Sequence, residues 1–222
     1  MNRQYNACGI SLVLFTAFSM MAILPKPSLA QTNRGVELYN SYDFKNAEQI
    51  LRKAIMANPV DMEASYYLGL SVLMQDKHEE ALGIFMKLLD AKNSAAPQSS
   101  AMVPDEYQIR LALARAQLEL KQNDAALKNL DAAGRAHTDT ADLHVYRGLY
   151  YLNIEKRQKA VKELETAIAM DGNNAYAHYY AGHAYLRSGN PSKAVEEFKL
   201  FLQLAPMAPE AVKAKALVDA LC

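Results

Sequence analysis

The sequence predicts an all-α fold, an α-solenoid of five helix-turn-helix repeats followed by a capping helix. Three observations support this prediction. Apolar residues follow a helical period through most of the chain after residue 30. Glycine and proline interrupt that period where one helix is expected to end and the next to begin. A pattern of small residues recurs five times, at intervals of 34, 45, 34 and 34 residues.

The pattern is clearest in the stretch 175–206, where two amphipathic helices are expected to meet at Ser188-Gly189-Asn190-Pro191. Asn190 is suited to cap the second helix, and Pro191 fits the first helical turn, where its missing N–H does no harm. Gly182 and Ala194 lie twelve residues apart, one on each helix. Small residues at these places let two helix backbones cross closely.

The same two small residues recur in every repeat, and we expect them to form the packing between paired helices. Each pair of helices buries its apolar face only by stacking on its neighbours. The alanine of the second helix is Ala47, Ala81, Ala126, Ala160 or Ala194, and the small residue twelve positions before it is Gly35, Gly69, Ala114, Gly148 or Gly182.

This spacing resembles that of the tetratricopeptide repeat (TPR) family, over about residues 31–206. The chain departs from the family pattern because a proline closes only two of the repeats, at Pro59 and Pro206, and because it has no tryptophan. The resemblance implies a right-handed superhelix. The repeats are expected at about 31–61, 62–95, 105–139, 140–174 and 175–208. A capping helix over 209–222 is expected to turn Val212, Ala216 and Leu217 toward the array.

Residues 1–30 have the pattern of a secretory signal peptide. Arg3 precedes a sixteen-residue apolar run from Gly9 to Leu24, and Ser28-Leu29-Ala30 offers small residues at the cleavage positions. We expect cleavage after Ala30. An uncleaved membrane anchor is less favoured, because a spanning helix needs about 20 apolar residues. The leader and the resemblance to a bacterial type of repeat protein together imply a periplasmic location.

The charge and cysteine content exclude several classes of function. With 24 basic and 24 acidic residues, the chain lacks the basic excess that phosphate binding requires, so we expect no nucleic-acid partner. Cys222 is the single cysteine after the leader and has no internal disulfide partner. It is either an incidental terminal residue or a site of intermolecular pairing.

The one long interval places eleven extra residues between repeats two and three. Residues 93–104 are polar and small with two prolines, which predicts a loop insertion. A tolerated insertion is the favoured interpretation, since loop-closure entropy grows slowly with length. A partner-contact arm and a hinge stay open as alternatives.

No motif in the chain indicates catalysis, a metal or a cofactor. The five histidines contain no i, i+4 pair and no HExxH, and there is no phosphate-binding glycine loop or nucleophile motif. We therefore predict a protein that is not an enzyme and binds no metal and no cofactor.

The resemblance implies that the first helix of each pair lines a concave groove. That groove would be apolar and rich in tyrosine, which suits an extended or helical peptide. It lacks the Lys and Asn set with which some family members hold a peptide's terminal carboxylate. An alternative is that these side chains fill a tight superhelix. The expected groove residues are Tyr39, Tyr66, Leu70, Leu73, Arg115, Leu149, Tyr176, Tyr179, His183 and Arg187.

The predicted function is a non-catalytic protein–protein interaction scaffold of the bacterial cell envelope. Its partners would be proteins or peptides, and it would reach a membrane only through a partner or an uncleaved leader. The alternative is a self-associating, homo-oligomeric component of a secretion, pilus or polysaccharide-export assembly.

Overall fold

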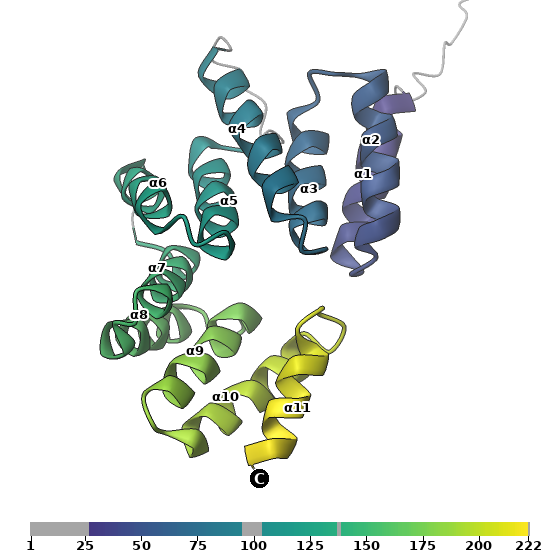
Figure 1. The fold of residues 1–222 in the computed structure, drawn as a ribbon. Helices are drawn as coiled ribbons and strands as arrows, with labels where there is room; N and C mark the ends of the chain where they lie inside the picture. The colour runs from purple at the N-terminus through teal and green to yellow at the C-terminus, as the bar shows by residue number, and fades with distance from the viewer. Residues whose placement is uncertain (1–26, 95–103, 137–138, 222) are drawn as a thin grey trace, which may run out of the picture.

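The structure is a computed structural model that describes residues 27–94, 104–136 and 139–221. Within these ranges the chain forms eleven α-helices and no strand, which confirms the predicted fold class (Figure 1). None of these helices is both long and apolar enough to cross a membrane. The helices are α1 (Pro27–Asn40), α2 (Phe44–Ala57), α3 (Met62–Leu73), α4 (His78–Ser94), α5 (Glu106–Glu119), α6 (Asn123–Ala136), α7 (Ala141–Asn153), α8 (Arg157–Met170), α9 (Ala175–Arg187), α10 (Pro191–Leu204) and α11 (Ala211–Leu221).

Several sequence-based expectations fall outside the described residues. These are most of the signal peptide (1–26), most of the loop insertion (95–103), His137 and Cys222. The described chain begins with α1, which runs through the predicted cleavage bond after Ala30. From Ser28 onward, the first fully buried side chain of α1 is Thr32, whose hydroxyl donates to Oδ2 of Asp61 at 2.8 Å. The tertiary packing of α1 therefore starts just after that bond.

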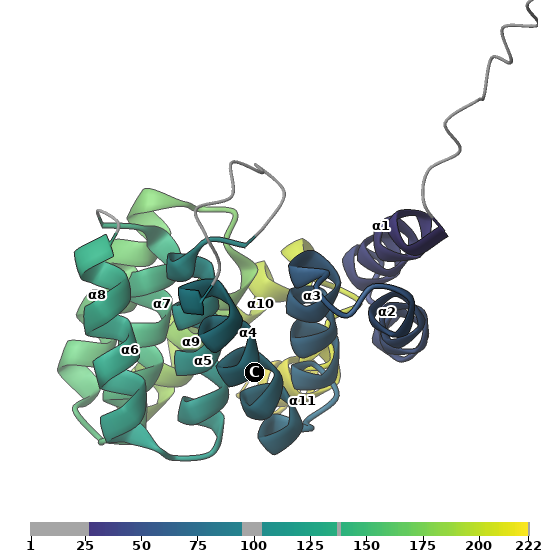
Figure 2. The same ribbon diagram turned by 90° about the horizontal axis from the view of Figure 1, so that it is seen from above.

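The helix pairs follow a curved path that brings the two ends of the array toward each other. In Figure 1 the end of α3 faces the turn between α10 and α11, and the view from above in Figure 2 also places α11 close to α3. A solenoid repeat ordinarily contacts only its neighbours. Here, repeats far apart in the chain share an inner surface.

The turn between the paired helices has the same backbone in all five repeats. Its left-handed residue always lies five positions before the repeat alanine. In the last repeat this is Gly189, and the N–H of Asn190 donates to the carbonyl of Tyr185 at 2.9 Å. The other four turns place a non-glycine residue there, at a cost of about 1 kcal/mol. These are Tyr42 (φ 64°), Asp76 (φ 60°), Lys121 (φ 59°) and Glu155 (φ 58°).

The predicted cap of α10 is confirmed. Oδ1 of Asn190 accepts from the N–H of Lys193 at 3.2 Å, and Pro191 occupies the first turn. The glycine of the first helix packs directly against a large side chain of the paired helix. A Cβ on Gly182 would lie 2.6 Å from Cε1 of Phe198, the residue four positions after Ala194. Each glycine thus makes room for a large side chain. The equivalent pairs are Gly35 with Leu51, Gly69 with Phe85 and Gly148 with Leu164.

A partly buried carboxylate links repeats one and two. Glu48 on α2 accepts hydrogen bonds from Arg52 at 2.8 Å, Lys77 at 2.7 Å and Gln75 at 2.9 Å. Burial alone would raise the pKa of Glu48, but the hydrogen bonds from Lys77, Arg52 and Gln75 lower it to about 2. Arg52 also pairs with Glu80 of α4, so the network continues across the repeat boundary.

The predicted face of the capping helix is wrong by about one residue. Val212 is 80% exposed and Ala216 is exposed, whereas Ala211, Ala214 and Val218 are buried against the array. The alanines allow α11 to approach α10 closely, and this contact sets the rotation of the helix. Leu217 is partly buried against the same core.

Candidate partner-binding site

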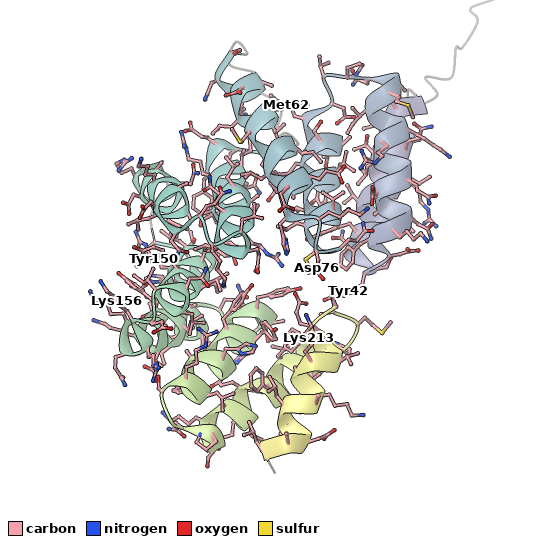
Figure 3. The ribbon with its side chains drawn as sticks, in the orientation of Figure 1. Tyr42, Met62, Asp76, Tyr150, Lys156 and Lys213 are labelled. Atoms are coloured by element: carbon pink, nitrogen blue, oxygen red, sulfur yellow. The ribbon has the colours of Figure 1, made fainter. Side chains whose placement is uncertain are left out.

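A cavity of about 320 Å³ lies on the inner side of the array. It is lined by residues of α3, α5, α7 and α9, by the turns that follow α3 and α5, by the first residue of α4, and by the turn before α11 and the start of that helix. Figure 3 labels two residues of this lining, Asp76 after α3 and Lys213 on α11. Six of the ten predicted groove residues line this cavity: Leu73, Arg115, Leu149, Tyr179, His183 and Arg187.

The other four predicted groove residues do not line the cavity. Tyr39 packs edge-on against Tyr67, with ring centroids 5.4 Å apart, and Tyr66 packs against Phe85 at 6.1 Å. Leu70 packs against the core of the first repeats. Tyr176 lies against Arg115. These four residues are half-buried beside the cavity, so the cavity contains only part of the predicted groove.

Of the six predicted groove residues that line the cavity, three are largely buried. The exposed fractions are 3% for Leu73, 8% for Arg115 and 8% for Leu149. The alternative considered from the sequence, that inner side chains fill a tight superhelix, thus applies to part of the predicted site. The physical reason is curvature, since a tightly coiled array brings its first helices together across the inner side.

Arg115 lies at the centre of this inner surface. Its Nη2 lies 3.1 Å from the sulfur of Met74, and its guanidinium carbon is 4.9 Å from the ring centre of Tyr176. Burial alone would lower the pKa of Arg115, but the facing hydroxyls of Tyr146, Tyr180 and Tyr176 raise it well above its usual value. The guanidinium is therefore charged at every ordinary pH.

Tyr176 closes the inner surface by joining distant parts of the chain. Its hydroxyl lies 3.8 Å from the sulfur of Met74 and donates to Oε2 of Glu210 at 3.0 Å. Met74 follows α3 in repeat two, whereas Tyr176 belongs to α9 in repeat five. These contacts cross the inner side of the array and link repeats two and five to the turn before α11.

Charged groups of both signs surround the cavity. Lys121 donates to Oδ1 of Asn153 at 2.7 Å, and Arg187 donates to the carbonyl of Leu152 at 3.0 Å. Glu119 accepts from the hydroxyl of Tyr180 at 3.4 Å. These polar groups suit recognition of a polar or charged ligand more than of a purely apolar one.

His183 has an aromatic environment at the cavity wall. Its ring lies between those of Tyr179 and Phe198, at centroid distances of 4.7 and 5.1 Å. Burial and the charge of Arg187 lower the pKa of His183 to about 4. The imidazole is therefore neutral near pH 7 and acts as a polar aromatic side chain.

Sequence reasoning missed several residues of this site. Glu210 and Lys213 belong to the predicted capping segment, for which the sequence indicated a purely structural role, yet both line the cavity. Their position next to the last repeat was the available signal. In the described part of the chain, no cluster of three or more His, Cys, Asp or Glu side chains could hold a metal ion.

Comparison with known proteins identifies the architecture. The tetratricopeptide repeat model matches residues 32–97 and 147–209. The stretch between these matches holds repeat three, where Ala114 replaces the usual glycine and Arg115 follows it. No curated protein sequence is significantly similar to the chain.

Two solved structures illustrate the shared fold. A thermophilic TPR protein of Thermus thermophilus, TTC0263, is 21% identical over 87% of this chain and 98% of that one, with a TM-score of 0.68. MamA (41-end) from Desulfovibrio magneticus RS-1 is 19% identical over 82% of this chain and 97% of that one, with a TM-score of 0.53. Arrays of such repeats act as protein–protein interaction scaffolds through their concave surfaces. From its helix pairs, its repeat packing and the family model, the chain belongs to the tetratricopeptide repeat family.

Proposed function

We propose that the protein is a non-catalytic scaffold that binds a peptide or helix of a partner protein at the inner cavity. The observation that carries this proposal is the composition of the cavity wall, to which repeats two to five and the last helix all contribute. Its volume of about 320 Å³ lies at the lower end of the range for ligand pockets.

We further propose that the protein works in the bacterial cell envelope, after export and removal of residues 1–30. The apolar run from Gly9 to Leu24 supports this, as does the fact that Thr32, just after the proposed cleavage bond, is the first fully buried residue of α1 from Ser28 onward. Mass spectrometry of the protein from fractionated cells tests it. An intact N-terminus in the cytoplasmic fraction would contradict export.

The binding proposal is tested by crosslinked co-purification from the native envelope with a charge reversal at the cavity. Lys213→Glu is suitable because Lys213 lines the cavity and is exposed, so the fold tolerates the change. Lys199→Glu on α10 makes the same charge change at an exposed position that does not line the cavity.

We expect a small set of partners with the native protein and with Lys199→Glu, and loss of that set with Lys213→Glu. Equal recovery with all three proteins would place the partner surface elsewhere. Circular dichroism checks that the variants have the helicity of the native protein.

Self-association is the second candidate function, and two exposed apolar side chains at the end of the array favour it. Met207, before α11, is 71% exposed and Val212, in its first turn, is 80% exposed. Light scattering over a range of protein concentrations would show oligomers that the Met207→Ser, Val212→Ser variant loses. A monomer at all concentrations would remove this candidate.

A further inference from the structure

Arg115 is a buried cation that no carboxylate of the described residues neutralises. It is 8% exposed, and its contacts are the sulfur of Met74, the ring of Tyr176 and a hydrogen bond with Tyr146. Burying a guanidinium is unfavourable unless opposite charge and hydrogen bonds compensate for the lost water. The polarisable ring and sulfur compensate only in part.

One edge of the guanidinium is left without a strong partner. The Nε–H of Arg115 is buried and donates to no acceptor among the described residues, and Nη2 lies 3.1 Å from the sulfur of Met74, which is a weak acceptor. Nε and Nη2 together form a fork of two parallel N–H groups. This fork matches the two oxygens of a carboxylate.

The acidic residues of the cavity do not supply that carboxylate. Glu210 accepts from the hydroxyl of Tyr176 at 3.0 Å, Glu119 accepts from the hydroxyl of Tyr180 at 3.4 Å, and the side chain of Asp76 is 87% exposed. None of these carboxylates forms an ion pair with Arg115 among the contacts of the described residues. An outside carboxylate is the remaining source of charge for the fork.

Met74 covers the fork and also lines the cavity. A methionine side chain has three rotatable bonds and adapts to several packing arrangements. Rotation of Met74 would therefore open a path from the cavity to the guanidinium without moving a helix.

We propose that the cavity binds the side-chain carboxylate of an Asp or Glu residue in the partner segment, and that the Nε–Nη2 edge of Arg115 receives it. The source of the carboxylate rests on the proposed function. The site itself does not, because a free carboxylate of the same shape fills it equally well. The inference therefore names an acidic side chain as the recognised feature of the partner.

Propionate, which has the shape of a glutamate side chain, tests the site without any partner. In a ¹H–¹⁵N spectrum of the purified protein, the Nε–H signal of Arg115 is expected to shift with saturation as propionate is added. Propionamide is the neutral control and should leave the signal in place. Arg115→Lys identifies the signal by removing it. Binding of propionate to this variant, followed by the backbone N–H signals of the cavity residues, should be roughly tenfold weaker, because lysine offers no bidentate fork.

Met74→Ala separates the site from a nonspecific effect of salt. It uncovers the fork, so propionate should bind severalfold more tightly. Met86→Ala is the matched control, since Met86 is 53% exposed on α4 and does not line the cavity. An Arg115 signal that propionate leaves unchanged in the native protein and in Met74→Ala would overturn the proposal.

Short peptides identify the source of the carboxylate. Acetyl-Gly-Glu-Gly-amide is expected to bind, and acetyl-Gly-Gln-Gly-amide is expected to bind at least about tenfold more weakly, as for the loss of a charged hydrogen-bonded pair. If acetyl-Gly-Gly-Gly with a free C-terminus binds more tightly than acetyl-Gly-Glu-Gly-amide, the recognised carboxylate is a chain terminus and the proposal of an acidic side chain is wrong. Binding of propionate alone would also overturn it and would leave a site for small organic acids.

The two proposals fail separately. Loss of partner capture in Lys213→Glu with no propionate binding would support the scaffold and refute the Arg115 site. Propionate binding with unchanged partner capture in Lys213→Glu would support the Arg115 site and refute partner binding at the cavity.

Discussion

The backbone of Gly148 lies against Leu164, so closely that a Cβ at position 148 would be 2.5 Å from the Cγ of Leu164. Leu164 is fully buried and has no space to retreat. We predict that Gly148→Ala lowers the free energy of unfolding by about 1–3 kcal/mol, because it overpacks the crossing of α7 and α8. Urea denaturation followed by circular dichroism measures this change.

Gly83 provides the control for that prediction. It lies inside α4, and a Cβ there would meet no atom within 4 Å. Gly83→Ala should raise the free energy of unfolding by about 0.5–1 kcal/mol, because alanine is the better helix former. If both substitutions change stability in the same direction, close packing at Gly148 is not the cause.

Substitutions at two left-handed turn residues should change the free energy of unfolding in opposite directions. Glu155 is exposed and has a φ of 58°, so Glu155→Gly should raise the free energy of unfolding by roughly 0.5–1 kcal/mol through relief of backbone strain. Gly189 has a φ of 80° and no atom within 4 Å of an added Cβ, so Gly189→Ala should lower it by about 1 kcal/mol. Thermal unfolding of the two variants measures both effects, and a stabilised Gly189→Ala protein would contradict this account.

Glu48 predicts a loss of stability in acid. The pKa of Glu48 is about 2 in the folded protein, below the ordinary value of 4.5. Its contribution to stability is therefore complete above pH 4.5 and is lost as pH falls toward 2. Glu48→Gln should cost roughly 1–3 kcal/mol at pH 7 and progressively less below pH 4.5, in urea denaturation at a series of pH values. Glu37→Gln, at an ion pair whose glutamate is 65% exposed, should change stability little. A pH-independent cost at Glu48 would show that charge is not responsible.

The pKa values of the two histidines of α9 should lie on opposite sides of the ordinary histidine value of 6.5. Nδ1 of His178 lies 2.6 Å from Glu197, which raises the pKa of His178 above 6.5, so its contribution to stability is complete below pH 6.5 and is lost at higher pH. His183 has its pKa lowered to about 4, so its contribution is complete above pH 6.5 and is lost as pH falls toward 4. Ring signals in an NMR titration measure both values. Glu197→Gln should lower the pKa of His178 alone, and titration of both rings near 6.5 would refute the prediction.

The fold was predictable from the sequence because its packing rule is local. Each pairing of a glycine with a large side chain, such as Gly182 with Phe198, involves residues sixteen positions apart and repeats along the chain. The rotation of α11 was not predictable in this way. No further repeat follows that helix to define its inner face, and the helical period alone places Val212 on the wrong side.

The site was predictable only in part. The helical register predicted that Tyr179, His183 and Arg187 share one side of their helix, and all three line the cavity. How tightly the array coils depends on a small rotation in each repeat that adds up along the chain. The sequence pattern does not contain that rotation, and so the burial of Arg115 and the role of Glu210 became visible only in the structure.

The contact between Met74 and Tyr176 also bears on how this protein can change in evolution. Open solenoids gain or lose whole repeats by duplication or deletion, since each unit depends on its neighbours alone. Here, one added or deleted unit between repeats two and five would carry Tyr176 away from Met74 and Arg115. The inner contacts therefore form only when the number of repeats between Met74 and Tyr176 is unchanged, so insertion or deletion of a repeat there would remove them.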